Sequence, residues 1–380
     1  MHKKVRKMPS FCQGLRSANQ GADETEKKKG ISERVQNITL WEDCLMLIRE
    51  NLEELEFQNL SRYATFSRNS KGRDRQEPQC DIRPVFQRDR DRILHSKAFR
   101  RLKDKTQVFL APEGDHYRTR MTHTLEVSQN ARTIAKALRL NEDLVEAIAL
   151  GHDLGHTPFG HAGERALNKV CPLGFVHSEQ SVRTVEVLER DGQGLNLTWE
   201  VRDGIRNHQT SLMPSTLEGK IVRISDKIAY IHHDMDDAIR AGILTEADVP
   251  KNIGDVIGYK LSDRLDSFIH DIVTNSMDRN DITMSDQVMQ AMKDMRTFMF
   301  ERVYQNPVAK SEEKKAETLI ATLYDYYCTH IDKLPSEYLK LINEGTEKER
   351  AVCDHISSMS DRFAIAMYEE LYIPKSWQVL

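Results

Sequence analysis

The stretch with the most chemically active side chains runs from Leu150 to Glu164 and reads LGHDLGHTPFGHAGE. It holds three histidines, an aspartate, a glutamate and four glycines. Nine of the 14 histidines in the chain lie between His116 and His233, so this crowding is part of a wider cluster. Imidazoles and carboxylates together can bind a divalent metal ion or transfer protons. We therefore expect metal or acid–base chemistry in this part of the chain.

Two of these histidines are expected to point inward from helices. His123 lies four residues before Val127, and His152 lies four residues after Ile148, so each continues the apolar face of a predicted helix. With Asp153 beside His152, the set could bind an ion such as Mn, Fe, Ni or Zn. The alternative for either histidine alone is a core residue whose ring bonds a backbone carbonyl. Only their combination favours a metal site.

The chain is expected to leave this helix a few residues after His152. His156 follows one turn later, on the same side of the helix. Pro158 disfavours the α conformation for Thr157, so the helix is predicted to stop there.

A second helix is predicted to begin near Gly160, which together with Gly163 flanks His161. Glu164 lies three residues after His161, so on a helix the two side chains would share a face and could form a hydrogen bond. A carboxylate that orients and charges an imidazole makes it a better general acid. The alternative is a Gly/Pro loop followed by an ordinary polar helix start, where glutamate is favoured.

A further carboxylate comes from the segment VRISDKIAYIHHDMDDAIRAG. Asp226, Tyr230 and Asp234 follow one another at intervals of four residues, roughly opposite a stripe of isoleucines. Periodicity alone favours the solvated face of a surface helix. The functional alternative is a polar face turned towards an internal pocket.

Helical periodicity extends over most of the chain after Arg90, which predicts an all-α fold with few short strands. The best strand-like run is KTQVFLA. Further helices are expected at 285–303, 312–331 and 348–371, and a helical pattern begins near Ile31 and strengthens at WEDCLMLIRENLEELEF. The predicted apolar stripes consist of Val127, Ala131, Ile134, Ala135 and Leu138; Leu144, Ala147, Ile148 and Gly151; and Ile221, Ile224, Ile228, Ile231 and Met235.

The chain is expected to form one large domain behind a short tail. Residues 1–30 are interpreted as a disordered basic tail, because they cannot bury enough apolar surface to offset the cost of ordering. Residues 31–380 are interpreted as a single domain, with a catalytic core at about 61–245 and a C-terminal helical region at about 250–380. Residues 61–90 are polar and arginine-rich, which predicts an ordered arm or loop.

The composition excludes several classes of protein. The 380 residues are 39% hydrophobic and 30% charged, and their net charge of −4 gives no general case for nucleic-acid binding. No apolar run approaches the roughly 18 residues of a membrane span, and no apolar segment follows the basic N-terminus as in a secretory signal. The six cysteines show no CxxC pairing, which is typical of free thiols in a reducing cytoplasm.

One basic segment precedes the histidine cluster and reads RDRDRILHSKAFRRLKDKTQVF. The commoner interpretation is a surface helix whose basic residues are solvated or paired with Asp89, Asp91 and Asp104. A second interpretation is a groove for single-stranded nucleic acid. A third, which only the family resemblance given below implies, is an approach to a nucleotide site or a subunit interface. The arginines that could serve either are Arg73, Arg75, Arg83, Arg88 and Arg100.

His123, the pair His152-Asp153, and Asp226 resemble the H…HD…D signature of the HD-domain metal-dependent phosphohydrolases. The longer string HDLGHTPFGHAGE is similar to the deoxynucleoside triphosphate triphosphohydrolases, which include bacterial dGTPase-like proteins and the SAM and HD domain dNTPase. The resemblance runs from about Tyr63 to Leu244. The tail and the region past residue 250 carry little that can be matched.

The resemblance implies hydrolysis of a dNTP to a deoxynucleoside and inorganic triphosphate, by metal-activated water that attacks the α-phosphorus. It implies one divalent ion per active site (Mn, Mg, Co, Fe, Ni or Zn), a homo-oligomer (tetramer or hexamer) and a regulatory dNTP. It implies these roles: His123, His152, Asp153 and Asp226 as metal ligands; His161 as general acid supported by Glu164; Arg120 and His156 at the phosphates; Tyr230, Asp234 and Gln107 at the deoxyribose; and, less directly, His177 of HSEQS, with Arg100 a further candidate.

Two rival functions remain. Another HD-domain phosphohydrolase, such as a nucleotide phosphodiesterase or an alarmone hydrolase, shares the four-ligand set but not GHTPFGHAGE. A nucleotide-sensing or single-stranded nucleic-acid-binding protein with an idle site belongs to a different class. Every matched catalytic position is filled, which argues against an idle site.

Overall fold

The computed structural model describes residues 48–107, 118–304 and 307–375. Within these ranges the protein consists of helices and loops without a strand, which confirms the all-α prediction. Two isolated backbone bridges, Arg73 with Thr198 and Thr106 with Thr119, are the β-type pairings seen there. The described part of KTQVFLA, residues 105–107, is not a strand, and the predicted tail at 1–30 lies outside the described residues.

The helices have the following bounds. Residues 48–59 are helical within the predicted N-terminal pattern. The first half of the chain continues with η2 (Ser67–Asn69), α2 (Val85–Leu94), α3 (Lys97–Arg101), η3 (Leu102–Asp104), α4 (Arg120–Ala137), α5 (Glu142–Gly151), α6 (Gly160–Val170), α7 (His177–Arg183), the π-helical η4 (Thr184–Leu188) and α8 (Glu189–Gly192). The second half has α9 (Trp199–Arg206), α10 (Leu217–Arg240), η5 (Glu246–Asp248), α11 (Lys251–Ile257), α12 (Leu261–Ser276), α13 (Asp286–Met299), the π-helical η6 (Phe300–Tyr304), α14 (Pro307–Thr329), η7 (Ile331–Lys333), α15 (Ser336–Asn343), α16 (Lys348–Ser357) and α17 (Asp361–Tyr372).

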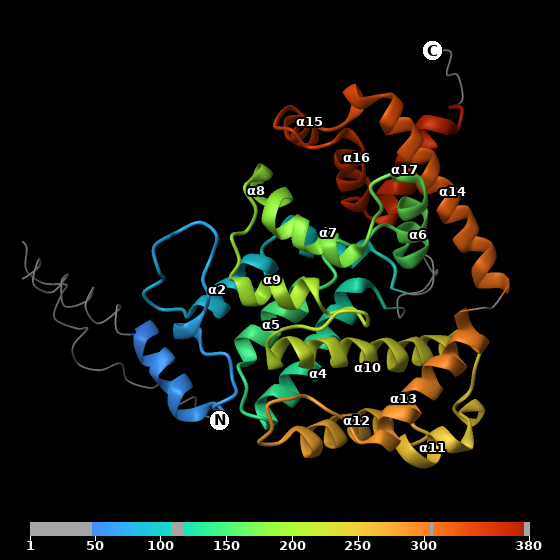
Figure 1. The fold of residues 1–380 in the computed structure, drawn as a ribbon. Helices are drawn as coiled ribbons and strands as arrows, with labels where there is room; N and C mark the ends of the chain where they lie inside the picture. The colour runs from blue at the N-terminus through green and yellow to red at the C-terminus, as the bar shows by residue number, and fades with distance from the viewer. Residues whose placement is uncertain (1–47, 108–117, 305–306, 376–380) are drawn as a thin grey trace, which may run out of the picture.

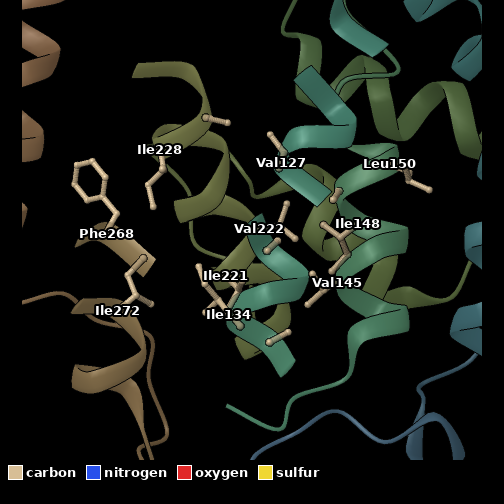
Figure 2. Packing of buried hydrophobic residues seen from close by; sticks show 14 of the residues in the cluster. Val127, Ile134, Val145, Ile148, Leu150, Ile221, Val222, Ile228, Phe268 and Ile272 are labelled. Carbon is tan, nitrogen blue, oxygen red and sulfur yellow. The ribbon is translucent and has the colours of Figure 1, made fainter. Parts of the chain in front are cut away.

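A first hydrophobic cluster is built around α4, α5 and α10, which pack against one another. Figure 2 shows Val127 and Ile134 of α4 close to Ile148 of α5 and to Val222 of α10. The three predicted apolar stripes lie in this cluster, and most of their side chains are fully buried. Helices α2, α9, α11, α12 and α13 cover it.

A second hydrophobic cluster joins α6 to the C-terminal helices α14–α17. Helix α6 packs along α14, although about 140 residues separate them in the sequence, as Figure 1 shows. Phe159, Ala166 and Leu167 contribute to this cluster from the α6 side. The two clusters therefore divide the LGHDLGHTPFGHAGE stretch: its first half closes the first cluster and its second half belongs to the second.

Three helices were expected after residue 285, and the described residues there contain five α-helices, of which α15 falls in none of the predicted segments. Helices α13 and α14 cover the segments predicted at 285–303 and 312–331, with α14 beginning five residues earlier than expected. The segment predicted at 348–371 is two helices, because α16 ends at Ser357 and Ser360 caps a new helix by accepting a hydrogen bond from the Phe363 N–H. No described helix is both long and apolar enough to cross a membrane.

Most of the arginine-rich segment is an ordered loop, although it includes η2 and its last residues belong to α2, and its basic side chains bind groups of the protein itself. Arg73 pairs with buried Asp89 and donates to the Asn196 carbonyl at 2.6 Å. Arg75 donates to the Gln193 carbonyl at 2.6 Å. Arg83 pairs with Asp91, and Arg88 donates to a backbone carbonyl. These contacts support the interpretation that the basic residues are paired within the fold, whereas Arg100 is exposed on α3.

Candidate active site

A cavity of about 650 Å³ lies where the two hydrophobic clusters meet. It is lined by Gln107, Arg120, His123, Asp153, His156, His161, His177, His208, Gln209, Thr210, Ser211, Asp226, Lys227, Tyr230, Ile231, Met289, Met292, Lys293 and Arg296. The cavity thus gathers side chains from the α4–α5–α10 cluster, from α6 and from α13.

His152 is oriented as a metal ligand would be. Helix α5 ends at Gly151, earlier than Pro158 predicted, and His152 is its buried C-cap residue. The Nδ1–H donates to the Ala149 carbonyl at 2.6 Å, which leaves the lone pair of Nε2 directed away from the backbone. That Nε2 is buried, and no described residue forms a hydrogen bond with it. The sequence alternative, a core histidine bonded to a carbonyl, therefore accounts for one ring nitrogen and not for the other.

Three more atoms that could bind a metal ion lie near the His152 Nε2 atom. It lies 3.5 Å from Asp153 Oδ1 and 3.7 Å from Asp226 Oδ1, and Asp226 Oδ1 in turn lies 3.1 Å from His123 Nε2. Ligands that each lie about 2.1 Å from one ion are separated by about 3 to 4.2 Å, so the spacing fits a single divalent ion. His123, His152 and Asp153 also form a buried group with all donor atoms within 4.8 Å.

The electrostatics of these donors are those of a cation site. Burial opposes charge on His152, but Asp153 and Asp226 outweigh it and raise its pKa to about 9. Burial likewise opposes ionisation of the two carboxyl groups, yet the neighbouring histidines hold the pKa of Asp226 well below its ordinary value, and His152 and Arg120 do the same for Asp153. Two ionised carboxylates therefore concentrate negative charge where the imidazoles converge.

Arg120 is a buried cation with unused donors. It is the first residue of α4, 2% exposed, and its Nη1 donates to Asp153 Oδ2 at 2.8 Å. Its Nε and Nη2 have no hydrogen-bond partner among the described residues, although the side chain lines the cavity. His156 beside it is also buried with Nδ1 unpartnered, and burial together with Arg120 lowers its pKa well below the usual value. The unpaired buried N–H groups of Arg120 fit an anionic ligand.

The turn that presents His161 is tight. Phe159 and Gly160 both adopt left-handed conformations, with φ of 63° and 54°, and α6 begins at Gly160. A side chain at Gly163 would place its Cβ 2.1 Å from the Pro158 carbonyl oxygen. Glycine at 163 thus permits close packing of the turn on α6 and does not simply leave room around His161.

Glu164 binds a different histidine from the one expected. Its carboxylate accepts from the His177 backbone N–H and from His177 Nδ1, both at 2.9 Å. Burial would raise the pKa of Glu164, but these contacts lower it to about 2. Among the described residues, Glu164 does not form the expected hydrogen bond to His161. A ring nitrogen of His161 nevertheless lies within 4.8 Å of a carboxylate oxygen of Glu164.

His177 lies at the centre of a histidine group that includes one residue the sequence interpretation missed. Its ring stacks on that of His156 with centroids 3.9 Å apart, and its Nε2 lies 3.3 Å from the Nε2 of His208. His208 is buried, bonds the Ile205 carbonyl, and packs edge-on against His152. Membership of the histidine cluster was the only sequence signal for His208, because its segment has no motif spacing.

Of the residues assigned to the sugar by resemblance, Tyr230 and Gln107 line the cavity. The Tyr230 ring is perpendicular to that of His161, with centroids 6.1 Å apart. Asp234 is 1% exposed one turn further along α10. The face of α10 that carries Asp226, Tyr230 and Asp234 is therefore turned to the interior, which decides between the two alternatives for this helix.

Three cations on the far wall were also missed. Lys227, Lys293 and Arg296 line the cavity from α10 and α13, and no described carboxylate lies within ion-pair distance of them. Desolvation and the nearby Arg223 lower the pKa of Lys227 to about 8. In sequence these residues look like ordinary surface charges. Arg100, a candidate in the sequence, is not among the lining residues.

Comparison with known proteins agrees with this geometry. Residues 120–231 match the family model described as the HD domain, and residues 282–370 match that of the phosphohydrolase-associated domain. A deoxyguanosinetriphosphate triphosphohydrolase-like protein of Caldanaerobacter subterraneus subsp. tengcongensis is 58% identical over 332 residues, which cover 87% of this chain and 98% of that protein. The chain belongs to the deoxyguanosinetriphosphate triphosphohydrolase-like family.

Other members of the deoxyguanosinetriphosphate triphosphohydrolase-like family are similar over the same share of the chain. The protein from Desulfatibacillum aliphaticivorans is 49% identical over 347 residues, and that from Clostridium perfringens (strain 13 / Type A) is 48% identical over 339 residues. Each match covers 87% of this chain and 99% of the relative. The family resemblance expected from the sequence is confirmed, and the HD domain makes the chain an HD-family nucleotide phosphohydrolase.

The similarity also extends past the limit that the sequence motifs indicated. The phosphohydrolase-associated domain covers most of the region after residue 250, where little could be matched from motifs alone. This region supplies Met289, Met292, Lys293 and Arg296 to the cavity wall. It is thus part of the family's structure and of the site.

Proposed function

We propose that the protein hydrolyses dNTPs, with dGTP-like substrates among them, to a deoxynucleoside and inorganic triphosphate in a metal-dependent reaction. One observation supports the proposal: two histidines and two carboxylates spaced for one cation, a buried arginine with unpaired N–H groups, and His161 all lie at a single cavity. A triphosphate ester needs all three, because it carries about four negative charges and a poor leaving group.

His123, His152, Asp153 and Asp226 would hold the divalent ion. When bound, such an ion supplies Lewis acidity, which neutralises phosphate charge and lowers the pKa of a coordinated water from 15.7 to about 7. The protein contributes the fixed orientation of the donors, through the His152 Nδ1–H bond to Ala149.

The phosphates would lie against Arg120 and His156. Arg120 has buried N–H groups without a partner among the described residues, so a phosphate oxygen would satisfy donors that are otherwise left unpaired. His156, whose Nε2 faces Asp153, would donate from Nδ1 once its ring is protonated. Lys227, Lys293 and Arg296 would face the outer end of the triphosphate, since they add positive charge to the same cavity. A substrate with fewer phosphates would leave part of this charge uncompensated.

His161 would donate a proton to the 5′ oxygen as the P–O bond breaks. Desolvation in the cavity and the Arg120 cation lower its pKa to about 4 in the free protein, whereas Glu164 acts in the opposite direction. A bound triphosphate would neutralise Arg120 and raise that pKa, so the acid would become charged when substrate is present. Glu164 would support His161 through its charge, while its hydrogen bonds hold His177 in place.

The deoxyribose would contact Tyr230, Gln107 and Asp234. Tyr230 lies beside His161, which is the side on which the 5′ oxygen leaves. A ring packed against C2′ would exclude a 2′ hydroxyl and select deoxyribose by steric exclusion. Gln107 is buried, and its Oε1 has no hydrogen-bond partner within the described part of the chain, which fits an acceptor for a sugar hydroxyl.

The test is product analysis with each dNTP, in the presence of Mg, Mn or Co. The proposal expects deoxynucleoside and inorganic triphosphate in equal amounts, and reaction in ¹⁸O-water should place the label in triphosphate, because water attacks phosphorus. Orthophosphate, pyrophosphate or a nucleoside monophosphate as product would reject it. Arg120→Ala should abolish turnover, whereas Arg100→Ala, on exposed α3, serves as the matched control.

The partners implied by family resemblance remain part of the proposal. Assays of dNTPs in pairs would reveal a regulatory dNTP as stimulation by a poor substrate, and light scattering would measure the oligomer. Binding of single-stranded nucleic acid is the weaker alternative, because the arginines of residues 73–92 are bound to the protein's own carboxylates and carbonyls. Cytoplasmic localisation also stays a prediction.

A further inference from the structure

The segment from Asp354 to Asp361 contacts the back of the active site at several points. It lies at the second hydrophobic cluster and runs from the last turn of α16 to the first residue of α17. Asp354 accepts hydrogen bonds from Gln180 and Arg183 of α7, the helix that begins at His177. The Ser357 carbonyl accepts from the buried Lys105 Nζ at 2.7 Å. These contacts reach segments that carry cavity residues, although more than 170 residues separate them in the chain.

Asp361 makes the contact nearest to the reacting groups. Its side chain is buried, at 4% exposed, and no described cation pairs with it. Oδ1 accepts from the Phe159 backbone N–H at 2.9 Å. Oδ2 accepts from the Thr106 backbone N–H at 2.9 Å and from the Thr106 hydroxyl. One carboxylate thus holds the residue two before His161 and the residue next to Gln107.

The Phe159 turn requires such support. A non-glycine residue in the left-handed region costs about 1–2 kcal/mol, and Phe159 adopts it at φ 63° immediately before Gly160 at 54°. Such strained conformations persist only where surrounding contacts determine them. The Phe159 N–H points outward from α6, since it lies before the first helical residue, and Asp361 is its acceptor.

The position of Asp361 matters because the proposed catalytic groups sit on two separate clusters. The cation donors belong to α4, α5 and α10, whereas His161 belongs to α6, which packs on α14. Asp361 ties the α6 turn to Thr106, which precedes α4 and pairs with Thr119 at its N-terminus. It therefore sets His161 relative to the groups that would bind the phosphates.

We propose that Asp361 is a positioning residue for proton donation, which fixes His161 against the leaving 5′ oxygen through Phe159 and Thr106. This inference rests on the proposed function, in which His161 is the general acid. A displacement of about 1 Å can cost roughly a hundredfold in rate. Loss of the Asp361 contacts would therefore lower the rate of catalysis more than it lowers the stability of the fold.

The test compares Asp361→Asn with Ser360→Ala in the full chain. An asparagine retains one oxygen, so its NH₂ group must face either the Phe159 or the Thr106 N–H, and one of these bonds is lost. Ser360→Ala removes the cap of the same helix and leaves both contacts in place. We expect kcat of Asp361→Asn to fall by about ten- to a hundredfold, with Mn²⁺ affinity unchanged, and Ser360→Ala to turn over like the wild type.

A leaving-group probe separates positioning from general damage. The probe is the preferred dNTP with sulfur in place of its bridging 5′ oxygen, because a thiolate leaves without protonation. The Asp361→Asn defect should shrink to less than about threefold on this analogue. An equal loss on both substrates, or an equal loss in Ser360→Ala, would overturn the inference.

A second variant covers the case in which Asp361→Asn does not fold. Thr106→Val removes one of the three donors and leaves the carboxylate in place, so kcat on the oxygen substrate should fall about three- to tenfold. Full activity of Thr106→Val on that substrate would also overturn the inference. A wild-type protein without dNTP hydrolysis would instead reject the proposed function, and the inference with it.

Discussion

Glu164→Gln should destabilise the protein in a pH-dependent way, because the carboxylate is ionised and tightly bound in the folded state. Its pKa falls from the ordinary 4.5 to about 2, despite burial, through its hydrogen bonds to His177. At 1.36 kcal/mol per unit, this shift corresponds to about 3 kcal/mol of stability at neutral pH. Glutamine keeps one acceptor oxygen, so the measured loss should be about 1–3 kcal/mol.

The sign of the pH dependence follows from the lowered pKa. The contribution is complete above the unfolded pKa of 4.5 and is lost as pH falls through about 2. By linkage it should drop to about half near pH 3.3. With about 2.1 cal/mol/K of unfolding entropy per residue, the neutral-pH loss corresponds to a Tm decrease of about 1–4 °C if the chain melts as one unit.

The assay is urea denaturation of wild type and Glu164→Gln at pH 7.5, 5 and 3.3, together with kcat at neutral pH. The matched control is Glu317→Gln. It removes a half-exposed ion pair between Glu317 of α14 and Arg165, the residue after Glu164 on α6, and should cost at most about 1 kcal/mol. We also expect kcat to fall about a hundredfold or more, because His161 loses the nearby negative charge of Glu164 and His177 loses its carboxylate hydrogen-bond partner. Equal stability of the two proteins at pH 7.5, or a difference that does not shrink at pH 3.3, would refute the pairing of Glu164 with His177.

Three further predictions concern the cavity and its turn. Arg120→Lys should lower kcat/KM by at least about tenfold in steady-state kinetics, because lysine keeps the charge but loses the planar fork that bonds Asp153 and a phosphate together; an unchanged value would exclude Arg120 from the site. Dialysis against a chelator should abolish turnover, and Mn²⁺ at a hundred times its Kd should add about 2.7 kcal/mol to the stability of wild type but not of His152→Ala, measured by thermal melting. Gly163→Ala should cost at least about 2 kcal/mol in urea denaturation, because its Cβ would meet the Pro158 oxygen at 2.1 Å; a neutral result would mean that the turn can open freely.

Sequence reasoning could reach the inward-facing side chains but not their partners. His123 and His152 continue apolar stripes, so their burial followed from helical periodicity. The inward face of α10 did not follow, since Asp226, Tyr230 and Asp234 have the spacing of a solvated face and only packing against α4 and α13 turns them inward. The family motif supplied what periodicity could not.

The remaining differences come from contacts between distant segments. Glu164 and His161 are close in sequence, but the carboxylate bonds His177, which a second helix brings to it. Helix α5 ends at Gly151, with His152 as its C-cap, before the Pro158 signal is reached. His208, Lys227, Lys293 and Arg296 carry no local signature, and their place in the cavity depends on the packing of α9, α10 and α13.

The separation of the proposed catalytic groups over two hydrophobic clusters has a mechanical consequence. The distance between the cation donors on α4, α5 and α10 and His161 on α6 is fixed by the seam between two packed bodies, and no single helix sets it. A substitution where the two clusters meet can therefore change kcat without replacing a reacting residue or unfolding either cluster. Contacts between the clusters should also open at a lower temperature than the cores on either side unfold. On heating, activity should therefore be lost before helical structure.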